Sequence, residues 1–137
     1  MDTVSQLRLE VQLGNPYPLH AGASSKAFLA FLSAEEIELY LAQHHLDPVT
    51  EKTIVDPEAL RLELAAIKRR GYATSQGERQ VGAASIAAPV FDHDGHVIAV
   101  LSAAGPLSRF KPRMADCAGR LLAAAGRVSA HLGYPAA

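Results

Sequence analysis

The sequence predicts an α+β domain in which one antiparallel sheet is flanked by helices. Three observations support this fold class. Helical patterns fill the first half of the chain after a short period-two stretch, two apolar runs then meet at an Asp-Gly turn, and a long amphipathic segment follows them. The predicted order is one strand, three helices, three strands and one helix. The length of 137 residues suits a single domain.

The first strand and the first two helices are predicted from local patterns. Residues 7–13 alternate apolar and polar side chains, which is typical of a strand with one buried face. A short apolar helix is expected over residues 23–32. Ser33 lies three residues before Glu36, the spacing of a capping box, so a second helix should begin there and end near Gln43.

The best-defined helix is expected over residues 57–70. Asp56 can cap its free amides, and Pro57 suits the first helical position. Apolar residues recur along the segment at helical spacing. Gly71 follows the last residue, where a C-terminal glycine belongs.

The segments that follow predict β-structure. A short strand is expected over residues 72–74, and the apolar runs 84–91 and 96–104 should form a hairpin around their Asp-Gly turn. Both runs are apolar at consecutive positions, so we expect both to be central strands with both faces covered. Gly105 and Pro106 should end the second run.

A final helix is predicted from about Pro112 to Leu132. Its inward stripe is expected to comprise Met114, Cys117, Leu121, Ala125, Val128 and Leu132. Cys117 is the only cysteine of the chain, so no internal disulfide can form. Its place on the stripe favours a buried structural thiol over a nucleophile, which needs an exposed and electropositive setting.

The composition argues against several classes of function. Lys plus Arg total 13 and Asp plus Glu total 14, so the chain lacks the basic excess of a domain that binds nucleic acid by itself. The start resembles no signal peptide, and no apolar run approaches the roughly 18 residues that span a bilayer. We therefore expect a cytoplasmic chain with no membrane partner.

No motif makes a positive case for catalysis. The sequence contains no Gly-x-Ser-x-Gly elbow, no Walker loop and no Gly-x-Gly-x-x-Gly segment. Histidine and aspartate gather at 44–47 and at 92–96, but a solvated turn accounts for the second cluster, and neighbouring strand residues point to opposite faces. We expect no enzymatic activity, no metal site and no cofactor.

Small polar residues give a different signal. Ser85 opens one apolar run, Ser102 closes the other, and Ser24 and Ser25 open the apolar helix. Hydroxyls near free helix amides, on an aliphatic lining, are typical of a pocket for a small polar or anionic molecule. Alternatively, each serine bonds the backbone at the end of its element. The residues alone favour neither interpretation.

Five stretches of sequence carry a family resemblance. They are Pro18–Ala30, Thr53–Pro57, Arg70–Ala73, Val81–Gly82 with Ser85–Phe91, and Leu101–Arg109. Together they resemble the effector-binding domain of the IclR-type bacterial transcriptional regulators. The resemblance implies a GAF-like fold with a pocket for a small organic effector, a carboxylate or an aromatic metabolite. It also implies self-association into dimers or tetramers, and DNA binding only through a separate winged helix-turn-helix domain.

The resemblance implies a pocket at the positions that match the family's motifs. These are Ala23, Ser24, Ser75, Ser85, Ser102 and Ala104. Ser75 stands where the family often has an acid, and Ala104 replaces one serine of a Ser-x-Ser pair. A pocket that lacks these two groups leaves polar ligand atoms unpaired, so we expect an effector less densely hydroxylated than a small keto acid.

The resemblance finally implies that residues 1–137 are one effector-binding domain, incomplete at its N-terminus. The DNA-binding domain, a linker helix and the first strands of the effector domain have no counterpart here. The sheet should then expose an edge, which favours pairing with another chain. Two alternatives remain open: a structural oligomerisation module without ligand, and an enzyme that uses the same pocket.

Overall fold

The computed structural model of the protein describes residues 18–135. Its elements are α1 (Ala23–Ala30), α2 (Ala34–Gln43), α3 (Pro57–Arg70), β1 (Ala73–Gln76), β2 (Ala83–Phe91), β3 (Val97–Pro106), α4 (Leu107–Phe110), a 3₁₀ turn η1 (Lys111–Arg113) and α5 (Met114–His131). The strand predicted over residues 7–13 lies outside the described part. Within residues 18–135, none of the helices combines the length and the apolar character that a membrane span needs.

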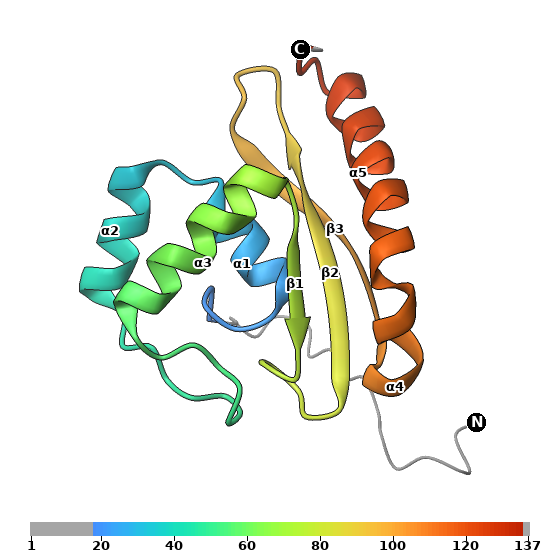
Figure 1. Cartoon of the computed structure of the whole chain (residues 1–137). Coiled ribbons are helices and arrows are strands. Elements are labelled where there is room, and N and C mark those ends of the chain that lie inside the picture. The colour runs from blue at the N-terminus through green and yellow to red at the C-terminus, as the bar shows by residue number, and fades with distance from the viewer. Residues whose placement is uncertain (1–17, 136–137) are drawn as a thin grey trace.

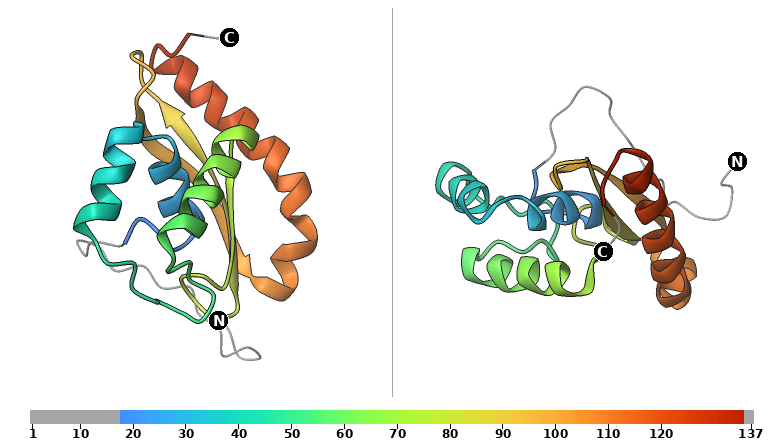
Figure 2. Two further views of the ribbon diagram at one scale, coloured as in Figure 1. Left: turned by 60° about the vertical axis from the view of Figure 1, so that its left-hand side comes forward. Right: turned by 90° about the horizontal axis from the view of Figure 1, so that it is seen from above.

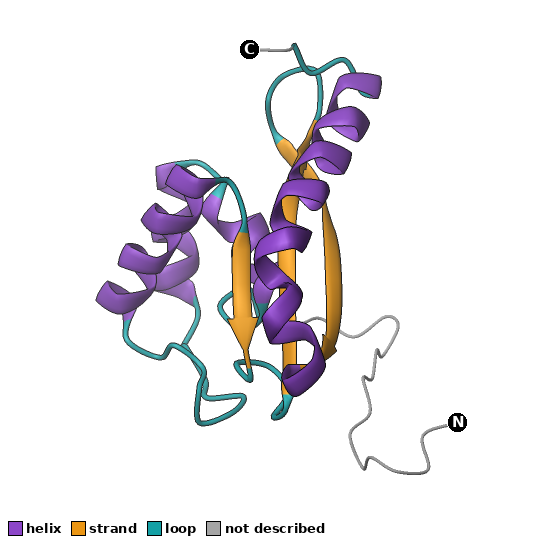
Figure 3. Ribbon diagram, turned by 45° about the vertical axis from the view of Figure 1, so that its right-hand side comes forward, coloured by secondary structure: helices purple, strands orange, loops and turns teal. Residues whose placement is uncertain are grey.

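The helices lie in layers on the two faces of an antiparallel sheet. Within residues 18–135 the strands pair in the order β1-β2-β3. Helix α1 packs on one face of this sheet with α2 and α3 beyond it, and α5 runs along the other face (Figures 1 and 2). Figure 3 shows α5 crossing the strands on its own side. The arrangement confirms the predicted α+β class.

Two helix starts form as the sequence predicts. The Ser33 hydroxyl accepts a bond from the Glu36 amide at 3.1 Å, and a Glu36 carboxylate oxygen accepts from the Ser33 amide at 3.1 Å, which completes a capping box. At α3, an oxygen of the Asp56 carboxylate accepts from the Ala59 amide at 2.9 Å. Gly71 ends α3 at a φ of 93°, a left-handed conformation that favours glycine.

The hydrophobic core is divided between the two faces of the sheet. On the α1 face, Leu29 of α1 and Leu60 and Ile67 of α3 are fully buried with small residues of the strands. On the α5 face, Val90 of β2 packs with Ala125 of α5. Alanines on the strands let α1 approach the sheet closely, and this close approach positions the N-terminus of α1 above the strands.

The predicted burial of the second apolar run is wrong. In the described part of the chain, β3 pairs with β2 along one edge and is therefore an outer strand. The adjacent and regularly paired residues Leu101 and Ser102 are half-buried and exposed, respectively, so neither face is fully covered. The strand continues through Gly105, which pairs with Ala84, and ends at Pro106, two residues beyond the predicted end. Other predicted ends of strands and of α1 shift by two residues or fewer.

The predicted inward stripe of the last helix is only partly correct. The α-helix begins at Met114, after a 3₁₀ turn that contains Pro112. Val128 and Leu132 are exposed, whereas Ser129 is buried and its hydroxyl donates to the Ala125 carbonyl at 2.8 Å. Cys117, which was predicted to be a buried thiol on the same stripe, is half-buried. The stripe is rotated because α5 faces the strand residues around Val90.

Candidate functional site

The six residues predicted to form a pocket line one cavity of about 250 Å³. They are Ala23, Ser24, Ser75, Ser85, Ser102 and Ala104. The cavity lies between the N-terminus of α1 and the strands beneath it. Ser102 and Ala104 are exposed, so the cavity opens toward β3, whereas Ser75 is 4% exposed and lies at its closed end.

The register of the strands brings these residues together. Ser75 of β1 lies opposite Ser85 of β2, and Ser85 lies opposite Ala104 of β3. Ser102 lies opposite Ala87, one pair further along the same face. Residues opposite each other in antiparallel strands project to one face of the sheet. Three segments distant in sequence therefore present small side chains to the same space under α1.

The serine hydroxyls are available to a ligand. Within residues 18–135, the side chains of Ser24, Ser75, Ser85 and Ser102 form no hydrogen bond. The alternative that each serine bonds the backbone at the end of its element is therefore wrong for Ser24, Ser85 and Ser102. Ser75 lines the cavity, so its hydroxyl can pair with a polar ligand atom there.

The N-terminus of α1 adds backbone donors to the same cavity. Gly22 is the N-cap and provides no side-chain cap, and the first bond of the helix runs from the Lys26 amide to the Gly22 carbonyl at 3.1 Å. The amides of residues 23–25 therefore have no partner within the helix. The positive end of the helix dipole lies here, so the wall formed by Gly22, Ala23 and Ser24 favours a negatively charged group.

Part of the cavity wall was not predicted from the sequence. Arg79 and Gln80, in the loop between β1 and β2, line the cavity, as do Gly22, Ala83 and Ala84. The loop falls between two stretches that carry the family resemblance, and its polar composition is equally typical of a solvated turn. No local pattern distinguishes the two cases, because the approach of this loop to α1 is a tertiary contact.

Arg79 packs directly over the N-cap of α1. A Cβ atom at Gly22 would lie 3.2 Å from Cδ of Arg79 and 3.4 Å from its Cβ. Gly22 has a φ of 94°, so both its conformation and the room it leaves require glycine. Among the described residues that line the cavity, Arg79 is the one cation, and none is an acid.

A buried ion-pair cluster lies beside the cavity. Lys26 of α1 is fully buried, and its Nζ donates to the carboxylates of Glu63 at 2.6 Å and Glu78 at 2.8 Å and to the Thr74 carbonyl at 2.9 Å. These three bonds use all three donors of the ammonium group. Burial raises the pKa of Glu78, and Lys26 opposes that rise.

The same cluster fixes the loop that carries Arg79. The Glu78 carboxylate forms the ion pair with Lys26, and the Glu78 backbone carbonyl accepts a bond from the Thr53 hydroxyl at 2.6 Å. The Thr50 hydroxyl donates to the Gly77 carbonyl. One side of the loop is thus anchored on α1 and on the segment before α3, and the next residue, Arg79, lies at the cavity.

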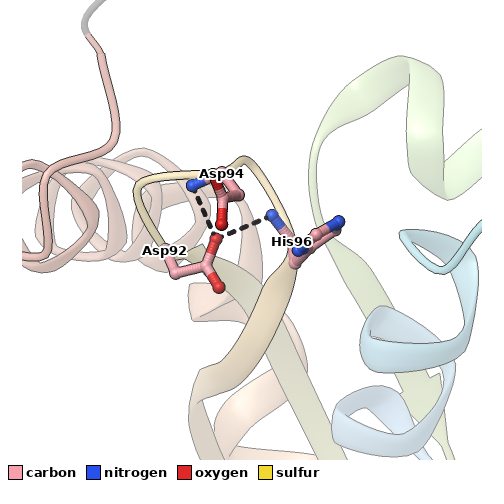
Figure 4. A group of neighbouring side chains, drawn as sticks. All are labelled: Asp92, Asp94 and His96. Carbon is pink, nitrogen blue, oxygen red and sulfur yellow. Dashed lines mark hydrogen bonds between the residues drawn. The ribbon is translucent and has the colours of Figure 1, made fainter.

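A second polar cluster lies in the β2–β3 turn. Potential ligand atoms of Asp92, Asp94 and His96 lie within 4.8 Å of one another (Figure 4). One oxygen of the Asp92 carboxylate already accepts bonds from the backbone amides of Asp94 at 2.9 Å and His96 at 3.0 Å. The His96 amide, followed by that of Asp94, lowers the pKa of Asp92. The geometry is that of an exposed turn.

Comparison with known proteins identifies the family. A family model described as "Bacterial transcriptional regulator IclR C-terminal" matches residues 1–130. The chain belongs to the IclR family. It is 38% identical over 129 residues to the HTH-type transcriptional regulator KipR of Bacillus subtilis, an alignment that covers 93% of this chain and 52% of KipR. The chain thus spans about half the length of this relative.

Solved structures of IclR-family proteins share the fold. The crystal structure of the Thermotoga maritima IclR superposes with a TM-score of 0.86 at 32% identity, over 96% of this chain and 53% of that one. The inducer-binding domain of PobR from Acinetobacter, a double mutant in complex with 3-hydroxybenzoic acid, gives a TM-score of 0.78 at 28% identity, over 90% and 73% of the two chains. These matches confirm the resemblance found in the sequence. The curated IclR-family relatives are regulators and repressors rather than enzymes.

Proposed function

We propose that this chain is the effector-sensing domain of an IclR-type transcriptional regulator. It binds a small organic acid in the cavity under α1 and thereby controls DNA binding by a separate helix-turn-helix domain. One observation carries the proposal: four serine hydroxyls that form no hydrogen bond within residues 18–135 converge on a cavity at the N-terminus of α1, whose N-cap Gly22 provides no side-chain cap. Hydroxyls and free amides together suit a ligand that carries a carboxylate.

The size and lining of the cavity narrow the class of effector. Its volume of about 250 Å³ is below the ~300–1,000 Å³ of pockets for drug-sized ligands. The described lining contains no aromatic or large aliphatic side chain, so polar contacts must orient the ligand. A compact acid with an aliphatic or aromatic body fits these constraints, and the PobR complex with 3-hydroxybenzoic acid shows such a ligand on the same fold.

Regulation follows from linkage between two binding sites. If an effector changes the affinity of the regulator for its operator, the operator changes the affinity for the effector by the same factor. We place this coupling in a self-associating regulator in the cytoplasm. Its subunits contact each other through effector domains such as this one, and its DNA contacts lie in the separate domain.

Calorimetric titration of the chain with a panel of small carboxylates, including 3-hydroxybenzoate and pyruvate, tests effector binding. At least one acid should bind, and Ser102→Leu should abolish that binding, because leucine fills the mouth of the cavity. Ser102 is exposed, so this variant should unfold at the same temperature as the unsubstituted chain. Ser108→Leu, at an exposed serine of α4 that does not line the cavity, is the matched control. Unchanged affinity in Ser102→Leu contradicts the proposed site.

A further inference from the structure

We propose that Arg79 sets the charge class of the ligand by binding its carboxylate, so that the cavity selects a single-carboxylate acid over the matching neutral amide and over diacids. This inference rests on the proposed function, since it names the chemistry of ligands for the same cavity. Neither the sequence pattern nor the family resemblance assigns a role to this arginine.

The charge balance of the cavity is the first argument. Among the described lining residues Arg79 is the one cation, and no carboxylate is present. Ser75 stands where the resemblance implies an acid, so the described lining contains one basic side chain and no acidic one. Lys26 cannot serve the ligand, because it is fully buried and its three donors are used by Glu63, Glu78 and Thr74.

The position of Arg79 is the second argument. Its side chain crosses the N-cap residue Gly22, where Cδ would lie 3.2 Å from an added Cβ. The aliphatic part of Arg79 therefore packs against the end of α1 whose amides have no helical partner, and the residue lines the cavity there. A guanidinium and a helix N-terminus both favour a negative group. Because a guanidinium has five N–H donors, it can hold a carboxylate while it also contacts a protein group.

The bonds that anchor the β1–β2 loop also support the assignment. Glu78 is held by Lys26 and its backbone by Thr53, so the residue before Arg79 is fixed in two directions. The backbone that carries Arg79 thus needs little further ordering when a ligand binds, which favours affinity. Ser75, 4% exposed and without a hydrogen-bond partner in residues 18–135, provides a neutral donor at the closed end. A second carboxylate would find no further cation among the described lining residues.

Paired ligands test the assignment. The chain is titrated with 3-hydroxybenzoate and 3-hydroxybenzamide, benzoate and benzamide, and pyruvate and pyruvamide. The diacid isophthalate is compared with benzoate. Each acid that binds should do so about tenfold or more tightly than its amide, because a charge-assisted pair is lost in the amide. The diacid should bind more weakly than benzoate.

Variants then locate the source of the preference. Arg79→Met should bring acid and amide affinities to within about twofold of each other, and Arg79→Lys should keep part of the preference, because lysine retains the charge without the planar fork. Arg120→Met is the matched control, since Arg120 is an exposed arginine of α5 on the opposite face of the sheet.

The outcomes separate this inference from the proposed function. If acids bind but Arg79→Met keeps the full preference for them, Arg79 is not the carboxylate ligand and the effector site still stands. Equal binding of acids and amides by the unsubstituted chain would likewise show that Arg79 does not select a carboxylate, and the effector site would still stand. If no acid and no amide binds, both the inference and the proposed function are overturned.

Discussion

At the scale of single residues, Gly22 has the most restrictive environment in the site. Its backbone lies at a φ of 94° and a ψ of 160°, a region that is essentially reserved for glycine. Arg79 also fills the space that a side chain would need. The start of α1, and with it the amides that face the cavity, depends on this one residue.

Gly22→Ala should therefore destabilise the fold and weaken ligand binding together. The strained backbone is expected to lower the free energy of unfolding by about 1–3 kcal/mol, and displacement of Arg79 should weaken the binding of acids. Gly119→Ala is the control, because Gly119 lies within α5 with nothing within 4 Å of an added Cβ. That change should stabilise the helix by about 0.5–1 kcal/mol. Denaturant titration of both variants measures the difference, and equal stabilities would refute the role given to Gly22.

Only some residues of the site could be predicted from the sequence. Ser24, Ser85 and Ser102 could be singled out from sequence because small polar residues at the ends of apolar elements are visible in the pattern. Ser75 and Ala104 required the family resemblance. Arg79 could not be found, because its loop reaches the cavity only through the bonds that Lys26 and Thr53 make after folding.

Glu78 makes the stability of the domain depend on pH. Burial raises its pKa above the ordinary value of 4.5, with Lys26 lowering it and Glu63 raising it. The folded state therefore binds a proton that the unfolded state has already lost. The contribution to stability is fully present below pH 4.5 and is lost as the pH rises through the raised pKa of the folded state.

Glu78→Gln should remove this contribution. The free energy of unfolding of the variant should fall less steeply above pH 4.5 than that of the unsubstituted chain, although the variant also loses its ion pair to Lys26. Denaturant titrations across the pH range give both curves. Their difference isolates Glu78, since Asp92, whose pKa is lowered, contributes equally to both. Parallel curves would show that Glu78 titrates alike in the folded and unfolded chains.

At the scale of elements, prediction succeeded where the signals are local. The bounds of α3 are those predicted, because its N-cap, its first-turn proline and its C-terminal glycine all lie within the helix or next to it. The burial of β3 on both faces and the inward-facing residues of α5 were predicted wrongly. Which face of these elements is covered depends on neighbours that are distant in sequence. An apolar run does not indicate which neighbours these are.

Helix α3 provides a test of how much its local signals contribute. Asp56→Ala removes the bond from the Ala59 amide to the Asp56 carboxylate and should lower the free energy of unfolding by about 1 kcal/mol. Asp56→Asn should lose much less, because asparagine is an equally good N-cap. Thermal and denaturant unfolding measure both variants. Equal losses would show that the charge of Asp56, not its capping bond, stabilises α3.

At the scale of the whole molecule, the outer strand β3 offers an edge to a second chain. In the described part of the chain its free edge carries no charged side chain, since Val97–Pro106 are all neutral. Natural proteins usually protect such an edge with charge, a bulge or a covering segment, and in β3 a register shift at Ile98 interrupts the pairing only near the start of the strand. Ile98, a large apolar residue on this strand, is 49% exposed. These features agree with the self-association that we propose for the regulator.

Sedimentation of the chain over a range of concentrations tests this association. We expect the apparent mass to rise with concentration toward a dimer or tetramer. Ile98→Lys should shift the equilibrium toward monomer, because a charge on an edge strand opposes pairing with a second strand. Leu62→Lys is the matched control, since Leu62 is 67% exposed on α3, in the helical layers away from β3. A monomer at every concentration would argue against self-association, and equal effects of the two lysines would exclude the β3 edge as the contact.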